Sequence, residues 1–157
     1  MKERLQKDLI SAMKEHNRKK ADTIKSVKAA IQMEEINSKK ELSEEEMLSI
    51  VTKQVKLRKD AVKDFEKAGR QDLIDSYNEE IDILNEYLPK PLTMEEINSI
   101  IDEAFNVVNP KAQSDMGKIM KEISPKLKNR ADMGEVNKII KEMFIFNLYI
   151  KMNLNIL

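Results

Sequence analysis

Apolar residues recur at helical spacing along most of the chain, and this pattern predicts an all-α protein. Near the start, Leu5, Leu9 and Met13 lie four residues apart, as residues on one face of a helix do. Similar stripes predict helices at about residues 2–16, 21–37, 44–68, 71–87, 94–108, 116–127 and 133–144. Polar residues fill the opposite faces, so we expect amphipathic helices that pack against one another.

Three capping boxes mark predicted helix starts. In each, a Ser, Thr or Asp side chain accepts the amide proton of a residue in the first turn. The side chain of a Glu three residues later accepts the amide proton of the capping residue in return. They are Ser43 with Glu46, Thr93 with Glu96, and Asp132 with Glu135. Ser114 or Asp115 is predicted to cap the sixth helix, and Pro125 is predicted to kink or terminate it.

The segment LPKPL (residues 88–92) is the predicted domain boundary, because two prolines one residue apart exclude helix and hold the backbone extended. It separates an N-terminal four-helix domain with a long helical hairpin (residues 1–88) from a smaller C-terminal three-helix domain (residues 93–144). Residues 145–157 form a more apolar tail. Two interpretations of the tail stay open: it prolongs the seventh helix, or it docks on a partner.

Composition narrows the possible functions. Aromatic residues make up 4% of the chain and charged residues 36%, which is typical of helix-rich rather than β-rich proteins. The 28 basic residues balance the 28 acidic ones, so any binding of a polyanion depends on a local patch. Cysteine is absent, which excludes disulfides and thiolate chemistry. No stretch has the length of a signal-peptide core or a membrane span, so we expect a cytoplasmic protein without membrane contact.

Residue groupings that carry catalysis are not evident. The single histidine, His16, stands at a predicted helix end, and no phosphate-binding glycine loop or metal-ligand spacing occurs. The sequence therefore predicts no catalytic residue, no metal and no cofactor. Arg58 falls on the apolar stripe of the third helix, where it is predicted to snorkel or to form a salt bridge.

The basic elbow, defined as residues 111–130, is the predicted working surface. Its six basic residues outnumber Asp115 and Glu122, which leaves a local net charge of +4; they are Lys111, Lys118, Lys121, Lys126, Lys128 and Arg130. Gly117 lies in a first helical turn, where it costs about 1 kcal/mol relative to alanine. A closely packed helix or a ligand would explain that bare backbone. An ordinary solvated lysine face stays open as the alternative.

Two Asp-Met-Gly copies lie in and beside the elbow, at residues 115–117 and 132–134. Both are interpreted as helix starts, since each aspartate stands where a cap belongs. The free amides of such helix starts suit phosphate oxygens.

Three segments, in this order, resemble the GatB/YqeY family: RKDAVKDFEKAGRQDL (residues 58–73), EIDILNEYLPKPLTMEEI (80–97) and SDMGKIMKEISPKLKNRAD (114–132). The resemblance covers about residues 1–144. This family comprises small stand-alone proteins and the C-terminal tail domain of the B subunit of the tRNA-dependent amidotransferase, which converts Glu-tRNA(Gln) or Asp-tRNA(Asn) to the amide. It implies an all-α fold with a four-helix domain followed by a three-helix domain.

The resemblance also implies that the C-terminal helices contact tRNA outside the anticodon. Its candidate contact residues are Gly117, Lys118, Lys121, Lys126, Lys128 and Arg130. The catalytic cradle of the B subunit has no counterpart in this chain, which favours an accessory role beside an amidotransferase or another tRNA enzyme. The chain departs from the family at Lys121, where a small residue is common, and at Asn129, where glycine is common. Asparagine tolerates the left-handed conformation, so the turn is predicted to survive.

Two other functions stay open at this point. The chain is alternatively a helical protein-interaction module that binds no RNA. As a second alternative, it takes part in a carbon–nitrogen ligase activity that uses glutamine as the amide donor.

Overall fold

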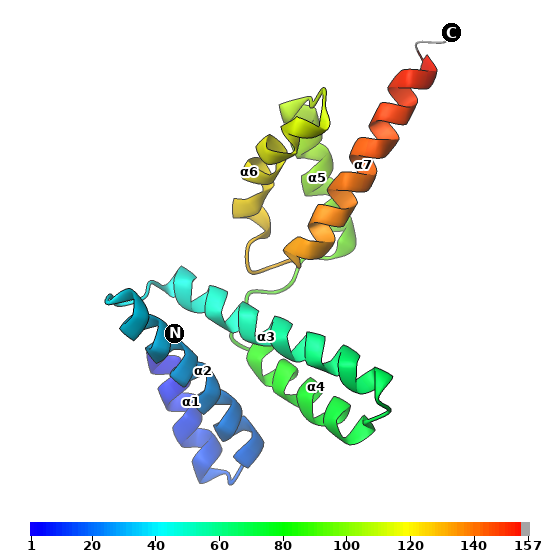
Figure 1. The fold of residues 1–157 in the computed structure, drawn as a ribbon. Coiled ribbons are helices and arrows are strands. Elements are labelled where there is room, and N and C mark those ends of the chain that lie inside the picture. The colour runs from blue at the N-terminus through cyan, green and yellow to red at the C-terminus, as the bar shows by residue number, and fades with distance from the viewer. Residues whose placement is uncertain (155–157) are drawn as a thin grey trace. The chain divides into compact units, whose positions relative to one another are not determined.

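The computed structural model describes the backbone of residues 1–154 and the side chains of residues 1–146, 149 and 150. The described residues form seven α-helices, one short 3-10 helix and no strand (Figure 1), which confirms the predicted all-α class. The chain divides into two compact units, Met1–Pro89 and Lys90–Leu157. None of the described helices combines the length and the apolar character that crossing a membrane requires.

The N-terminal unit contains α1 (Lys2–Lys14), α2 (Arg18–Ser38), α3 (Glu44–Lys67) and α4 (Gln71–Asn85). Helices α3 and α4 form a long hairpin, and α2 packs against α1 and against both hairpin helices (Figure 1). The apolar stripes of all four helices meet in one core, whose most deeply buried side chains are Leu5, Ile24, Val27, Val51 and Leu84.

Two of the predicted capping boxes are confirmed in full. At the start of α3, the amide of Glu46 donates to Ser43 Oγ at 3.3 Å, and the amide of Ser43 donates to Glu46 Oε2 at 2.9 Å. The corresponding distances for Thr93 and Glu96 are 3.2 and 2.8 Å. These reciprocal bonds satisfy amides that the first turn of a helix otherwise leaves without partners.

The turn between α1 and α2 is tighter than the sequence pattern predicts. Helix α1 ends at Lys14 rather than at His16, because His16 adopts the left-handed conformation, with φ of 57°. Helix α2 begins at Arg18 rather than near Ala21, because Asn17 Oδ1 accepts the amide proton of Lys20 at 3.0 Å and caps the helix.

Arg58 forms a salt bridge, which was one of the two possibilities predicted for it. Its Nε lies 2.9 Å from Glu80 Oε2 on α4, and its side chain is 11% exposed. Lys19 of α2 approaches the other oxygen of Glu80 at 3.9 Å and also donates to Ser76 Oγ. One carboxylate therefore joins charged groups from three helices.

The C-terminal unit contains α5 (Met94–Val108), the 3-10 helix η1 (Gln113–Asp115), α6 (Met116–Leu127) and α7 (Met133–Leu154). Helices α5 and α6 pack directly on each other. The core of the unit takes side chains from α5, α6 and α7, and those with no exposed surface are Ile101, Ile119, Ile123, Leu127 and Ile140.

The turns of the C-terminal unit follow the sequence closely. Asn109 ends α5 in the left-handed conformation, with φ of 45°. Asn129 adopts the same conformation, with φ of 61°, so the turn after α6 survives where the family often has glycine. Helix α6 continues through Pro125 to Leu127, so the proline does not terminate it; the helix ends where Lys128 leaves the helical conformation, with ψ of 131°.

The described side chains near the end of helix α7 are largely exposed. Phe144 is the last of its described side chains that is buried, yet the helix continues to Leu154. Residues 145–154 thus prolong the seventh helix, and the final three residues of the predicted tail lie outside the described residues. Ile145, Phe146 and Tyr149 are each about two-thirds exposed, at 67%, 64% and 67%.

Candidate nucleic-acid interface

The second Asp-Met-Gly copy starts a helix as predicted. Asp132 Oδ1 accepts the amide protons of Gly134 at 2.7 Å and of Glu135 at 3.4 Å, which caps α7. Because these amides already donate to a carboxylate, this helix start does not offer them to a phosphate.

The first copy behaves differently, and the prediction that Asp115 caps α6 is wrong. Asp115 has near-helical dihedral angles, φ −79° and ψ −3°, because η1 runs directly into α6. A capping residue normally has an extended backbone, which aims its side chain at the following amides. The Asp115 carboxylate instead turns back to accept the amides of Lys111 at 3.0 Å and Ala112 at 3.3 Å. It also accepts from Lys118 Nζ at 2.8 Å.

These contacts lower the pKa of Asp115 to about 2 from an ordinary value of 3.8, chiefly through the hydrogen bond from Lys118 and then through the two amides.

We expect the Asp115 carboxyl resonance to titrate with a midpoint near pH 2 in an NMR experiment on the folded chain. Because folding lowers the pKa of Asp115, the ionised carboxylate stabilises the folded state. This contribution to stability is complete above the pKa of the unfolded chain and is lost as the pH falls through the pKa of the folded chain. The variant Lys118→Gln should raise the midpoint, and a midpoint at 3.8 in the folded wild type would contradict the arrangement.

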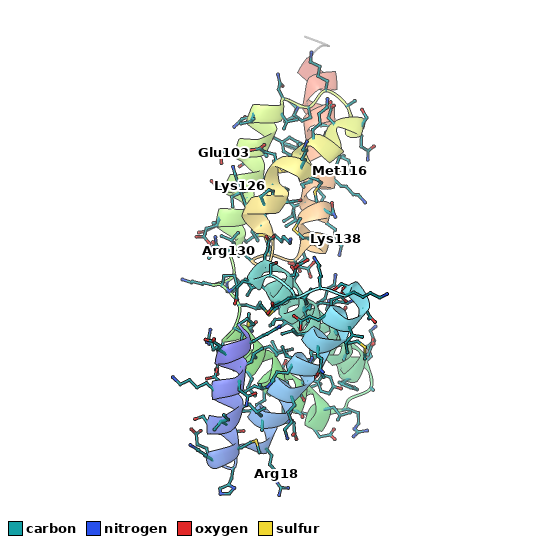
Figure 2. The ribbon with its side chains drawn as sticks, turned by 90° about the vertical axis from the view of Figure 1, so that its left-hand side faces the viewer. Arg18, Glu103, Met116, Lys126, Arg130 and Lys138 are labelled. Atoms are coloured by element: carbon teal, nitrogen blue, oxygen red, sulfur yellow. The ribbon has the colours of Figure 1, made fainter. Side chains whose placement is uncertain are left out.

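Two of the predicted contact lysines are engaged with nearby carboxylates. Lys118 pairs with Asp115, and Lys126 Nζ lies 3.3 Å from Glu103 of α5 and 3.9 Å from Glu122. Figure 2 shows Lys126 and Glu103 together at the α5 side of α6. Their positive charge is therefore partly offset before any ligand approaches.

Arg130 holds the elbow to the beginning of the C-terminal unit. Its Nε donates to the carbonyl oxygen of Lys90 at 3.2 Å, and its own carbonyl oxygen accepts the amide proton of Leu92 at 2.9 Å. Both contacts join residues about forty positions apart, within one compact unit. The structure thus gives Arg130 a role in shaping the turn.

Lys121 lies on a different side of α6 from Lys126, which faces Glu103 of α5. Gly117 is one turn before Lys121 on the same face, and Lys118, three residues before Lys121, borders that face. Lys128 directly follows the last residue of the helix, and Gly117, Lys121 and Lys128 are all exposed. Lys121 makes no ion pair with any residue in the described part of the chain, so its charge is available to a ligand.

Helices α5 and α7 both expose charged side chains. Helix α5 exposes the carboxylates of Glu95, Asp102 and Glu103. Helix α7 exposes Lys138 and Lys141, with the exposed carboxylates of Glu135 and Glu142 close to them in sequence; Figure 2 shows Lys138 on the far side of α6 from Glu103. The sequence-based set of contact residues omits these two lysines, because residue spacing identifies the face of one helix but not the helix beside it.

Groupings typical of catalytic metal centres do not occur among the described residues: no three His, Asp or Glu side chains gather as metal ligands. The protein is thus a small all-α protein, and helix α6 of its C-terminal unit exposes lysine side chains. The family model for YqeY-like proteins matches residues 2–144, and the chain belongs to that family.

Several fungal proteins are similar to the chain. "Altered inheritance of mitochondria protein 41, mitochondrial" from Pyrenophora tritici-repentis is 28% identical over 143 residues, which cover 89% of this chain and 78% of that protein. The protein of the same name from Clavispora lusitaniae is 29% identical over 142 residues, covering 88% and 82%. The Candida glabrata protein is 36% identical over 86 residues, covering 54% and 47%.

These names contradict the cytoplasmic location expected from the sequence, which is therefore corrected. The expectation rested on the lack of an apolar leader or span. Mitochondrial targeting segments are amphipathic and basic rather than apolar, so that criterion does not separate mitochondrial proteins from cytoplasmic ones.

Proposed function

We propose that this protein is an accessory module that binds tRNA through α6 and acts beside an amidotransferase or another tRNA enzyme. The observation that carries the proposal is the side of α6 turned away from Glu103. Lys121 is exposed there, one turn from Gly117, and Lys128 is exposed directly after the end of the helix. Phosphate contacts of this kind position a protein on nucleic acid and supply much of its affinity.

The six candidate residues take different parts in this proposal. Lys121 contacts a phosphate from the exposed face of α6, and Lys128, which follows the helix, contacts a neighbouring phosphate. Lys118 and Lys126 add to the field, but each must exchange a carboxylate for a phosphate to bind directly. Arg130 acts by holding the elbow in shape through the Lys90 carbonyl.

Membership of the YqeY-like family supports the choice of tRNA as the ligand, through the resemblance to the tail domain of the amidotransferase B subunit. The equal numbers of acidic and basic residues in the whole chain support a local interface rather than binding over the entire surface.

The test is the salt dependence of binding between the full chain and a fluorescent tRNA transcript. With about four phosphate contacts, log affinity should fall against log salt with a slope of about 3 to 4. The double variant Lys121→Gln/Lys128→Gln should reduce that slope by about 2, since each phosphate contact accounts for about one unit. The matched control is Lys53→Gln/Lys56→Gln, which removes the same charge from exposed positions on α3.

Wild-type affinity that does not change between 50 and 200 mM salt, or no binding at 50 mM, would show that the chain is not a tRNA-binding module. Equal losses in the α6 and α3 variants would show that RNA responds only to overall charge and that α6 is not the interface.

A second candidate function, docking on another protein, is supported by the exposed apolar side chains of α7. Ile145, Phe146 and Tyr149 expose about two-thirds of their surface beyond the core of the unit, and apolar groups gathered in this way often mark an interaction site. Capture of partners by the tagged chain, with and without ribonuclease, separates the two functions. Partners lost after ribonuclease favour tRNA binding, and partners retained favour protein docking.

A further inference from the structure

An open groove lies between α1 and α2 in the N-terminal unit. It has a volume of about 790 Å³, and its lining comes from residues 2–10 of α1 and 28–35 of α2. Of its apolar lining residues, Leu5 and Ile31 belong to the core, whereas Ile10 exposes 44% of its surface. The groove therefore presents apolar surface between two helices.

The end of α7 exposes an apolar side of its own. Ile145, Phe146, Tyr149 and Ile150 follow one another at i, i+1, i+4 and i+5, which places them on one side of the helix. The first three are about two-thirds exposed, and Ile150 is 37% exposed. The family model matches residues 2–144, so the part of the chain that the family shares ends before this apolar side begins.

We propose that the end of α7 of one copy of this chain docks in the α1–α2 groove of a second copy. A helix that lays its apolar side in a groove is a common mode of recognition. At 1.5 Å per residue, the groove is about 12 Å long on α1 and about 10 Å long on α2, and the apolar side of α7 is about 8 Å long. The inference names a partner for the protein-docking function and does not depend on tRNA binding.

The charges around the groove favour an uncharged occupant. Its charged lining residues are Lys2, Lys7, Lys28, Glu3 and Glu35, and Lys2 already pairs with Glu35 at 2.7 Å. The lining is thus nearly neutral and offers little attraction to a strongly acidic or basic partner. Residues 143–150 of α7 contain no charged side chain, so they bring no charge that docking would bury without a partner.

The contact is expected to be weak and to join different surfaces of the two copies. Phe146 and Tyr149 are two-thirds exposed, so together they can bury about 200 to 330 Å². A stable interface buries about 800 Å² per partner, so we expect association only at high protein concentration. Each docked pair leaves one groove and one α7 end available, and further copies can therefore add to it.

The experiment measures the average mass of the ribonuclease-treated full chain by analytical ultracentrifugation, from micromolar to millimolar concentration. We expect the wild-type mass to rise with concentration. Ile10→Lys in the groove and Phe146→Lys/Tyr149→Lys in α7 each place a charge in the apolar contact, so each should weaken association by about tenfold or more. The matched controls Met33→Lys and Val107→Lys replace apolar side chains that are 59% and 68% exposed and lie outside the groove and α7. They should associate like the wild type.

Mixing the two variants tests the contact directly. Ile10→Lys retains the wild-type α7 end, and Phe146→Lys/Tyr149→Lys retains the wild-type groove, so the mixture contains one complete contact. We expect a heterodimer and no larger species, at a concentration where each variant alone stays monomeric. Because both variants add lysine, attraction between the new charges does not explain such a heterodimer.

A wild-type mass that stays that of the monomer, equal losses in the controls, or a mixture that stays monomeric would overturn the proposal. Association lost in the α7 variant but retained in Ile10→Lys would overturn it as well, because α7 would then bind elsewhere. If Ile10→Lys loses helix content by circular dichroism, Ile10→Gln takes its place with the same expectation. None of these measurements involves tRNA, so their failure leaves the proposed tRNA-binding function in place.

Discussion

Replacing Glu80 by alanine is expected to lower the free energy of unfolding of the N-terminal unit by about 3 kcal/mol, because removal of one partner from a largely buried ion pair leaves the other charge uncompensated. Arg58, only 11% exposed, would lose its carboxylate partner at 2.9 Å. Lys19 would lose its weaker contact with the same group. Urea unfolding monitored by circular dichroism measures the change.

A double variant tests whether the cost comes from the stranded charge. Arg58→Met/Glu80→Met removes both ions, and well-packed apolar replacements of a buried pair are often neutral or stabilising. We therefore expect the double variant to be more stable than Glu80→Ala. The exposed neighbour Glu79 supplies the control, Glu79→Ala, with a change within about 0.5 kcal/mol. A cost for Glu80→Ala no larger than that of the control would show that the ion pair is not important for stability.

Local sequence patterns predict much of this fold, because the interactions that set helix boundaries connect near neighbours. The boxes at Ser43 and Thr93 join residues three positions apart, and the structure contains both. The apolar stripes likewise identify the helix faces that form the cores, and the position of Arg58 on such a stripe leaves two possibilities, a snorkelling side chain or a salt bridge, of which the structure shows the salt bridge. The identity of that partner, Glu80, depends on the packing of the α3–α4 hairpin.

The candidate site was less predictable from the sequence, for two physical reasons. Asp115 and Asp132 have the same following residues, yet only Asp132 caps its helix, because η1 places Asp115 in a near-helical conformation. Lys126 contacts Glu103, 23 positions away, besides its helical neighbour Glu122, and Arg130 contacts Lys90, 40 positions away; helical spacing does not predict the two distant partners. A count of charges within the elbow treats all six basic residues alike, whereas the structure separates them by partner.

Because the basic residues of the elbow have different partners, their positive charges are not equally available to a ligand. Asp115 and Glu103 partly offset the charges of Lys118 and Lys126, whereas Lys121 is exposed and makes no ion pair within the described part of the chain. The proposed interface is therefore narrower than the basic stretch of sequence that contains it. Its geometry depends on a folded C-terminal unit, and that dependence can be tested at the core residue that ends α6.

Leu127→Ala is expected to destabilise the C-terminal unit by about 3 to 5 kcal/mol, because Leu127 has no exposed surface and its truncation leaves a cavity. The core of a domain below about 70–80 residues rarely supplies more than about 3–5 kcal/mol, so this change should largely unfold the unit. The carbonyl oxygen of Leu127 also accepts the amide protons of Arg130 and Ala131, each at 3.0 Å, so the elbow turn should be lost with the core. Amide hydrogen exchange across α5, α6 and α7 measures the loss.

The same variant separates a folded interface from a merely basic peptide, since every lysine and arginine is retained. If phosphates are bound by Lys121 on α6 and Lys128 just after it, held in the folded arrangement, tRNA affinity at low salt should disappear together with exchange protection. Leu127→Met conserves side-chain volume and should cost less than about 1.5 kcal/mol, which leaves both the fold and the affinity in place. Wild-type affinity in an unfolded Leu127→Ala unit would mean that RNA responds to the charge of the segment alone, and the proposed contact geometry on α6 would then be wrong.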